Sequence, residues 1–218
     1  MWDANYAPLK ALDYGVGGDK TQDVLRRIAV GHFDKLKPKV VVLMIGTNNT
    51  GTGSKPAEIA DGVTAILQRL ARRLPNTKIL LLAIFPARRE ARRSDAPQQR
   101  GREQASSSRF ADGERVHYRD IGKVFLRDDG VLTPEIMPDM LHLSPKGYQL
   151  WAEAMDPELK RLPERIVGER AGAGVSGAHR ARTIRARKSA IVAKITRPRP
   201  GRSTAPSAAS RGGRLARR

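Results

Sequence analysis

Two short apolar runs separated by an amphipathic helix constrain the fold of this chain more than any other feature. The runs cover residues 38–45 and 78–85, are rich in Val, Ile and Leu, and stop at Gly46 and Pro86. Such runs are typical of strands that are buried on both faces of a sheet. Between them, apolar residues recur at helical spacing: Ile59, Val63, Ile66, Leu67, Leu70 and Leu74. We therefore expect a strand–helix–strand unit with its two strands in parallel.

Weaker signals extend this alternation on both sides. Residues 11–16 and 116–121 are further strand candidates, and Asp19 is expected to cap the short helix that follows it. Ser144 and Pro145 suit the N-cap and the first turn of a last helix. That helix would direct four apolar side chains to the core: Tyr148, Trp151, Met155 and Leu159. The alternation predicts a three-layer α/β/α sandwich, with its site at the carboxyl ends of the strands.

Residue usage excludes several classes of site. The chain has no Cys, which excludes a disulfide scaffold and a thiolate metal centre. The histidines lie far apart and show no metal-ligand spacing: His32, His117, His142 and His179. No apolar run approaches the roughly 20 residues that a membrane helix needs. We expect neither a metal nor another cofactor.

The net charge of +19 is concentrated in the C-terminal quarter of the chain. Residues 165–218 carry +14, lack aromatic residues and are rich in Arg, Ala, Gly, Ser and Pro, whereas residues 1–164 carry +5. We expect a disordered basic tail after a domain that spans residues 1–164. Within the tail, residues 178–195 could form a short helix with basic faces. An arm that binds nucleic acid or an anionic surface is the alternative. The Arg-rich stretch 87–108 is expected to be a solvated helix and loop.

Three segments at the ends of predicted strands contain side chains or backbone suited to catalysis. Residues 15–19 are glycine-rich, so their backbone N–H groups can approach an oxyanion, although a tight turn has the same composition. Asn48 can donate to an oxyanion or cap a turn. Asp139 precedes His142 by three residues and can orient its imidazole as a general base, although a capping loop with an incidental His fits as well. The three segments together, in this order, are more specific than any one of them.

In this order the segments resemble the SGNH hydrolase superfamily, also called GDSL-type esterases. The likeness is greatest to the branch that contains the catalytic subunits of platelet-activating factor acetylhydrolase Ib and their bacterial relatives, and covers about residues 2–162. The segments that resemble the family's sequence pattern are residues 6–12, 14–19, 38–49, 57–62 and 136–144. The resemblance implies a flavodoxin-like sandwich and hydrolysis of a small-molecule ester without a cofactor. The oligomeric state stays open, although the nearest relatives form dimers.

The resemblance also implies a role for each candidate residue. Gly18 would give a backbone donor and Asn48 a side-chain donor to the oxyanion hole. His142 would be the general base and Asp139 its orienting partner. Asn49 stands where many superfamily members have Asp.

One part of the family pattern is absent from this chain. The family nucleophile is a Ser in a Gly-Asp-Ser block at the end of the first strand, and that block would lie upstream of Met1. Because the first strand lies inside the sheet, between the strands ending near Val16 and Ile45, its loss would leave a gap near 10 Å or a sheet that closes up. We therefore hypothesise that the sequence is a truncated reading of a longer gene.

Two functions remain open at this point. One is a serine ester hydrolase of the SGNH class, for which the chain supplies everything but the nucleophile. The other is an inactive pseudo-esterase whose basic tail binds nucleic acid or anionic surfaces. Residues 1–5 show no leader-like pattern, but a signal peptide would have been lost together with the missing block. The localisation therefore stays open, and is cytoplasmic only for the chain as written.

Overall fold

A five-stranded parallel sheet lies at the centre of the structure, a computed structural model that describes residues 2–85, 110–171 and 190–193. Its strands are β1 (Leu12–Asp13), β2 (Val40–Leu43), β3 (Lys78–Leu82), β4 (Val116–Arg119) and β5 (Ala190–Ala193). They are ordered β1-β5-β2-β3-β4, and each neighbouring pair is parallel. The pairing of β2 with β3 confirms the predicted strand–helix–strand unit.

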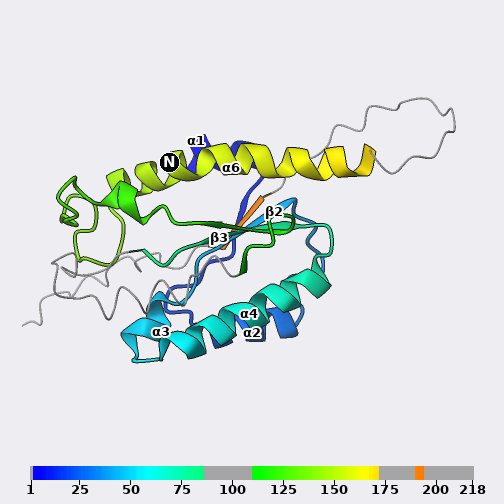
Figure 1. Cartoon of the computed structure of the whole chain (residues 1–218), viewed down its shortest axis with the longest axis horizontal. Helices are drawn as coiled ribbons and strands as arrows, with labels where there is room; N and C mark the ends of the chain where they lie inside the picture. Colours follow the sequence, from blue (N-terminus) through cyan, green and yellow to red (C-terminus); the bar gives the residue numbers. More distant parts are fainter. Residues whose placement is uncertain (1, 86–109, 172–189, 194–218) are drawn as a thin grey trace, which may run out of the picture.

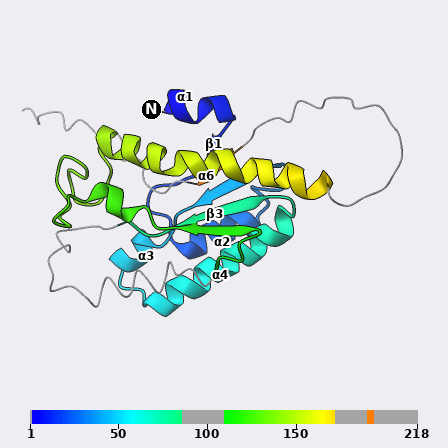
Figure 2. The same ribbon diagram turned by 45° about the horizontal axis from the view of Figure 1, so that its top comes forward.

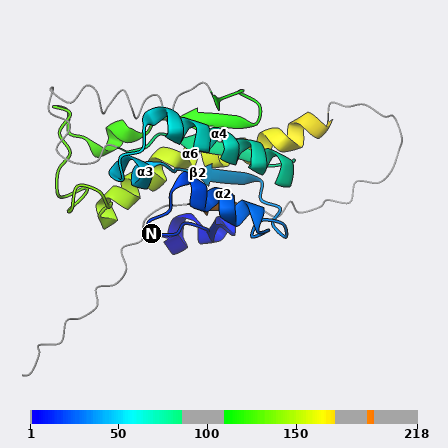
Figure 3. The ribbon, with the colours of Figure 1, turned by 90° about the horizontal axis from the view of Figure 1, so that it is seen from below.

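Helices cover both faces of the sheet, which confirms the predicted three-layer sandwich. The α-helices are α1 (Trp2–Asn5), α2 (Thr21–Ala29), α3 (Thr47–Gly51), α4 (Pro56–Arg73) and α6 (Pro145–Ala171). Short 3-10 helices cover Ala7–Leu9 and Gly122–Phe125. Figure 1 shows α6 on one face and α2 with α4 on the other, Figure 2 shows α1 beside α6, and Figure 3 shows α2 and α4 side by side. No helix in the described ranges is long and apolar enough to cross a membrane.

The core divides into two layers because successive strand side chains point to opposite faces. Every residue of β2 and β3 is buried. On the α6 side, Val42 and Leu80 pack in one cluster with Trp151, which is 1% exposed. On the other side, Val41 and Ile79 pack with the inward faces of α2 and α4. A strand at the centre of this sheet therefore has to be apolar on both faces.

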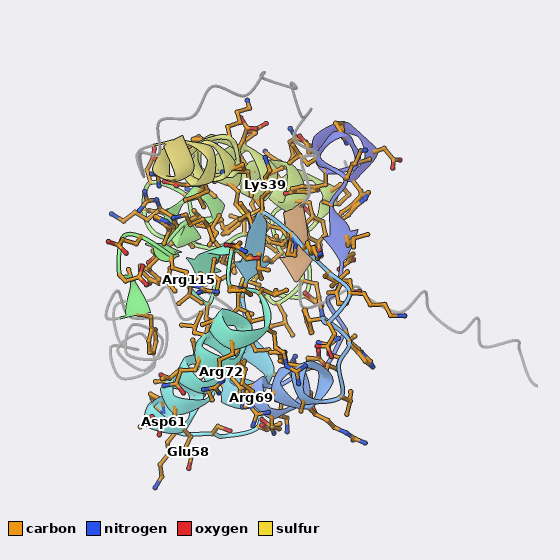
Figure 4. All side chains as sticks on the ribbon, turned by 90° about the vertical axis from the view of Figure 1, so that its right-hand side faces the viewer. Lys39, Glu58, Asp61, Arg69, Arg72 and Arg115 are labelled. Atoms are coloured by element: carbon orange, nitrogen blue, oxygen red, sulfur yellow. The ribbon has the colours of Figure 1, made fainter. Side chains whose placement is uncertain are left out.

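Charges on α4 follow its helix dipole. Figure 4 labels four of them: Glu58, Asp61, Arg69 and Arg72. The acidic residues lie in the N-terminal half of the helix and the basic residues in its C-terminal half, the arrangement that the dipole favours. Arg115, just before β4, donates from Nη2 to the carbonyl oxygens of Ala71 (3.0 Å) and Leu74 (2.6 Å). It thereby satisfies carbonyl groups that the end of α4 leaves without helical partners.

Several expectations from the sequence need correction. The first strand covers two residues rather than residues 11–16, and Lys20, not Asp19, is the N-cap of α2. Helix α6 ends at Ala171, beyond residue 164, and the domain boundary predicted there stays a prediction. Residues 190–193 form a strand, not part of a helix or of a wholly disordered tail. This strand lies between β1 and β2, where a gap or a closed-up sheet was expected. The Arg-rich stretch 87–108 lies outside the described residues.

Candidate active site

The candidate residues follow strand ends or precede α6. Gly18 lies in the loop after β1, and Asn48 lies in α3 directly after β2. Because the strands are parallel, these two positions meet at the carboxyl edge of the sheet. His142 lies in the loop before α6, and Figures 1 and 3 show α3 and the start of α6 at the same end of the molecule.

Asp139 and His142 form a hydrogen-bonded pair within one turn of chain. The ring Nδ1 of His142 faces Oδ2 of Asp139 in a short contact. The other carboxylate oxygen accepts the backbone N–H groups of Leu141 (3.0 Å) and His142 (2.7 Å). Met140, between them, has a φ of 59°, a conformation that is uncommon for residues other than glycine. The arrangement leaves Nε2 as the ring nitrogen for proton transfer.

The electrostatics of this pair keep Asp139 ionised. Partial burial acts to raise the pKa of Asp139, but hydrogen bonds from the His142 ring and from two backbone N–H groups outweigh it and lower the pKa to about 2. The carboxylate is therefore an anion throughout the range in which imidazole titrates. An anion here orients the ring and stabilises the imidazolium form without taking the proton itself.

The loop that carries His142 is fixed by the start of α6. The Ser144 hydroxyl accepts the backbone N–H of Gly147 (3.1 Å), which confirms Ser144 as the N-cap, and donates to the carbonyl oxygen of Glu135 (2.6 Å). The backbone N–H of Ser144 donates to the carbonyl oxygen of Ile136 (2.8 Å). A Cβ on Gly147 would lie 2.7 Å from that same oxygen, so glycine permits the close approach. These contacts hold the residues just after His142 in place.

On the sheet side, the Gly18 loop and Asn48 are joined directly. Gly18 has a φ of +88°, which L side chains rarely adopt. The Asn48 amide Nδ2 donates to the carbonyl oxygen of Asp19 at 2.8 Å. An amide nitrogen has two N–H groups, so one remains for another acceptor. Asn48 is thus tied to the residue that follows Gly18.

The same region includes an ion pair that sequence reasoning missed. Asp19 is 8% exposed, and its carboxylate pairs with the Arg27 guanidinium, which also donates from Nη1 to the carbonyl oxygen of Tyr14 (3.0 Å). Burial, with a smaller contribution from the nearby charge of Asp23, raises the pKa of Asp19, and Arg27 acts against both. The available signal was the position of Arg27, three residues after the buried Val24 on the inward side of α2.

Asn49 connects the same region to α2. It is 4% exposed, and its Oδ1 accepts the backbone N–H of Thr21 at 3.0 Å. Its Nδ2 donates to the hydroxyl oxygen of Thr21 (3.3 Å) and to the side-chain oxygen of Gln22 (3.3 Å). The two adjacent asparagines therefore bond different segments: Asn48 bonds the loop after β1, and Asn49 bonds the start of α2.

These residues offer a proton acceptor and hydrogen-bond donors. Within the part of the chain that the structure describes, no group of three or more His, Asp or Glu side chains could hold a metal ion. A His–Asp pair is the arrangement that general-base chemistry uses, and asparagine amides and backbone N–H groups are the donors that oxyanion sites use.

Comparison with known proteins points to one hydrolase family. Residues 2–150 match the model of the GDSL-like lipase/acylhydrolase family. The human platelet-activating factor acetylhydrolase IB subunit alpha1 is 32% identical over 164 residues, which cover 74% of this chain and 69% of that protein. The alpha2 subunit from Rattus norvegicus is 31% identical over 175 residues, which cover 78% and 73%.

Solved structures show the same fold. A GDSL-like lipase from Bacteroides thetaiotaomicron superposes with a TM-score of 0.57 at 16% identity. The superposition covers 73% of this chain and 82% of that one. The fold is therefore shared even where few residues are identical.

Proposed function

Because this chain belongs to the GDSL-like lipase/acylhydrolase family, within the SGNH hydrolases, we propose that it forms the base and oxyanion parts of an acyl ester hydrolase. The observation that carries this proposal is the His142–Asp139 pair, with its ring Nδ1 against an ionised carboxylate. A general base needs one ring nitrogen held in this way and the other directed to the reacting group.

Each residue has a distinct role in this mechanism. His142 Nε2 removes the proton from the attacking hydroxyl and later donates it to the leaving alkoxide. Asp139 keeps the proton of the neutral ring on Nδ1. Gly18 N–H and Asn48 Nδ2 donate to the oxygen that becomes negative in the tetrahedral intermediate. Loss of one such donor costs about 10²–10³-fold in kcat in a comparable hydrolase.

None of the 218 residues is proposed as the nucleophile. The sequence contains no Gly-Asp-Ser block. Ser144 has its hydroxyl engaged with Gly147 and Glu135 in capping α6. A base and an oxyanion site alone assist only attack by water, so we expect the chain as written to be weaker by orders of magnitude than a form that supplies a serine.

The experiment compares two forms of the protein on 4-nitrophenyl acetate. One is the chain as written, and the other is extended upstream by the genomic reading frame. We expect rapid hydrolysis and labelling by a fluorophosphonate only in the extended form. His142→Ala in that form should abolish turnover, whereas His32→Ala should not, because His32 is an exposed histidine in the turn after α2.

Two results would contradict the proposal. Turnover that survives His142→Ala would contradict the assignment of the base. If the upstream frame encodes no Gly-Asp-Ser block, and the chain as written is no faster than its His142→Ala variant, the hydrolase proposal fails. Asn48→Ala tests the oxyanion site separately, because loss of an oxyanion donor should lower kcat more than it raises KM.

A further inference from the structure

Arg27 holds the glycine-rich loop after β1 at both of its ends. Its Nη1 donates to the carbonyl oxygen of Tyr14 at 3.0 Å, and its Nη2 pairs with the carboxylate of Asp19. These two partners directly precede and follow residues 15–18. Arg27 lies in the last turn of α2, so its own backbone belongs to a helix and not to the loop. One guanidinium thus spans the whole segment from a separate element.

The composition of this loop makes such support necessary. Residues 15–18 read Gly-Val-Gly-Gly, and glycine loses more conformational freedom on ordering than any other residue. The one side chain among them, Val16, is 48% exposed, so packing contributes little to ordering the loop. Its own hydrogen bonds are local: the Gly15 N–H donates to Asp13 Oδ1 (2.9 Å), and the Asp19 N–H donates to the Val16 carbonyl oxygen (3.2 Å). A contact from another element is therefore needed to fix the loop in place.

The same anchor extends to the second donor of the proposed oxyanion site. Asp19 accepts from Arg27 through its carboxylate, and from the Asn48 amide through its carbonyl oxygen at 2.8 Å. Asp19 also directly follows Gly18 in the chain. Arg27 therefore holds the residue that is bonded covalently to one donor and by a hydrogen bond to the other.

We propose that Arg27 is a positioning residue for the oxyanion site, and that its pairing with Asp19 and Tyr14 fixes the Gly18 N–H relative to Asn48 Nδ2. The inference rests on the proposed function, which assigns these two donors. Donors stabilise a developing oxyanion most when they are already in place, because no reorganisation is then needed during the reaction. Without Arg27 both donors remain present but are less well ordered, so the transition state loses more stabilisation than the bound ester does.

Backbone ¹⁵N relaxation of the chain as written tests the ordering of the loop without an assay of activity. We expect order parameters near 0.85 for the amides of Gly17 and Gly18 in the parent, and values below about 0.6 in Arg27→Ala. The amides of α4 should be equally rigid in both. Arg26→Ala replaces the adjacent, exposed arginine of the same helical turn and should leave the loop rigid.

Two results of this measurement would overturn the proposal. One is a loop that is already flexible in the parent, and the other is a loop that stays rigid in Arg27→Ala. Arg27→Lys provides a second variant if Arg27→Ala does not fold. It keeps a cation opposite Asp19 but lacks the planar fork that also reaches Tyr14, so the order parameters of the loop should lie between those of the parent and of a flexible segment.

Kinetics of the upstream-extended form test the role in the reaction. With 4-nitrophenyl acetate, we expect Arg27→Ala to lower kcat at least about tenfold and to change KM less than about twofold, with part of the loss recovered in Arg27→Lys. Rates are expressed per site labelled by the fluorophosphonate, so that unfolded protein does not lower kcat. A kcat for Arg27→Ala equal to that of Arg26→Ala would overturn the proposal, and would leave Arg27 a role in stability alone.

A double variant shows whether Arg27 acts through the oxyanion donors. If it does, Arg27→Ala combined with Asn48→Ala should lower kcat by less than the product of the two single losses. Losses that multiply in full would place the action of Arg27 elsewhere and overturn the proposal. An extended parent that does not hydrolyse the ester would contradict the proposed function, whereas the relaxation measurement decides the ordering of the loop in either case.

Discussion

Removal of Arg27 should destabilise the fold through the charge that it leaves behind on Asp19. The side chain of Asp19 is 10% exposed and that of Arg27 is 19% exposed. Breaking a buried ion pair by deleting one partner costs about 3–5 kcal/mol, and the partial exposure of Arg27 places this pair near the lower end. We therefore expect Arg27→Ala to lower the free energy of unfolding by about 3 kcal/mol at pH 7. The Tyr14 carbonyl oxygen also loses a donor in this variant.

The loss should depend on pH, with a defined sign. Burial raises the pKa of Asp19 in the folded protein above its ordinary value of 3.8, and Arg27 opposes that rise. A raised folded-state pKa contributes stability that is fully present below the unfolded pKa and is lost as the pH rises through the folded pKa. Without Arg27 the folded pKa rises further and more stability is lost. The deficit of Arg27→Ala should thus be small near pH 3.5 and complete near neutrality.

Urea unfolding, followed by tryptophan fluorescence at several pH values, measures this deficit. Arg27→Lys keeps the charge but not the planar fork that reaches both Asp19 and Tyr14, so we expect a loss of about 1 kcal/mol. Asp19→Asn combined with Arg27→Ala should recover much of the stability of the single variant, because the uncompensated charge is gone. A deficit equal at all pH values, or no recovery in the double variant, would refute the electrostatic reasoning and indicate lost packing instead.

Three further outcomes follow from single positions. Gly46→Ala should lower the free energy of unfolding by about 2 kcal/mol or more, measured by thermal unfolding. The new Cβ would lie 2.7 Å from the buried Ile84, and Gly46 has a φ of +122°, which L side chains rarely adopt. In the control Gly51→Ala, the new Cβ meets no atom within 4 Å, so this variant should be tolerated. Tyr6→Phe should be neutral or slightly stabilising in the same assay, because the buried hydroxyl has no hydrogen-bond partner among the residues that the structure describes. His142→Ala should raise the pKa of Asp139 from about 2 towards its ordinary value, which a carboxyl NMR titration measures; a pKa that stays near 2 would show that the backbone N–H groups suffice.

The parts of the fold that could be predicted are those whose signals are local. The spacing of apolar residues over 59–74 predicts a helix without knowledge of its neighbours. Strands β2 and β3 are apolar on both faces because helices cover both faces of the sheet. Ser144 caps α6 through a residue three positions away. The Asp139–His142 pair was visible for the same reason, because its members lie within one turn of chain.

What the sequence could not predict depends on distant partners. The helical spacing of apolar residues after residue 178 suggested a helix, yet residues 190–193 form a strand, because pairing with β1 and β2 outweighs local periodicity. The Arg27–Asp19 pair forms only because α2 is oriented with Arg27 facing the loop that carries Asp19, and the sequence does not reveal that orientation. The hydrogen bond from Asn48 to Asp19 joins two loops separated by 29 residues.

The position of β5 has a consequence for how the chain reaches its native state. Strand β5, between β1 and β2, is the last described strand to leave the ribosome, 147 residues after the end of β2 (190 − 43) and 177 after the end of β1 (190 − 13). Among the described residues, β5 is the partner of β1 and of the outer side of β2, and an unpaired strand edge is a template for pairing with other chains. Such late, non-local pairing slows folding and lengthens exposure to aggregation. Synthesis of this protein should therefore be most sensitive to chaperone supply in its final stage, before β5 pairs with β1 and β2.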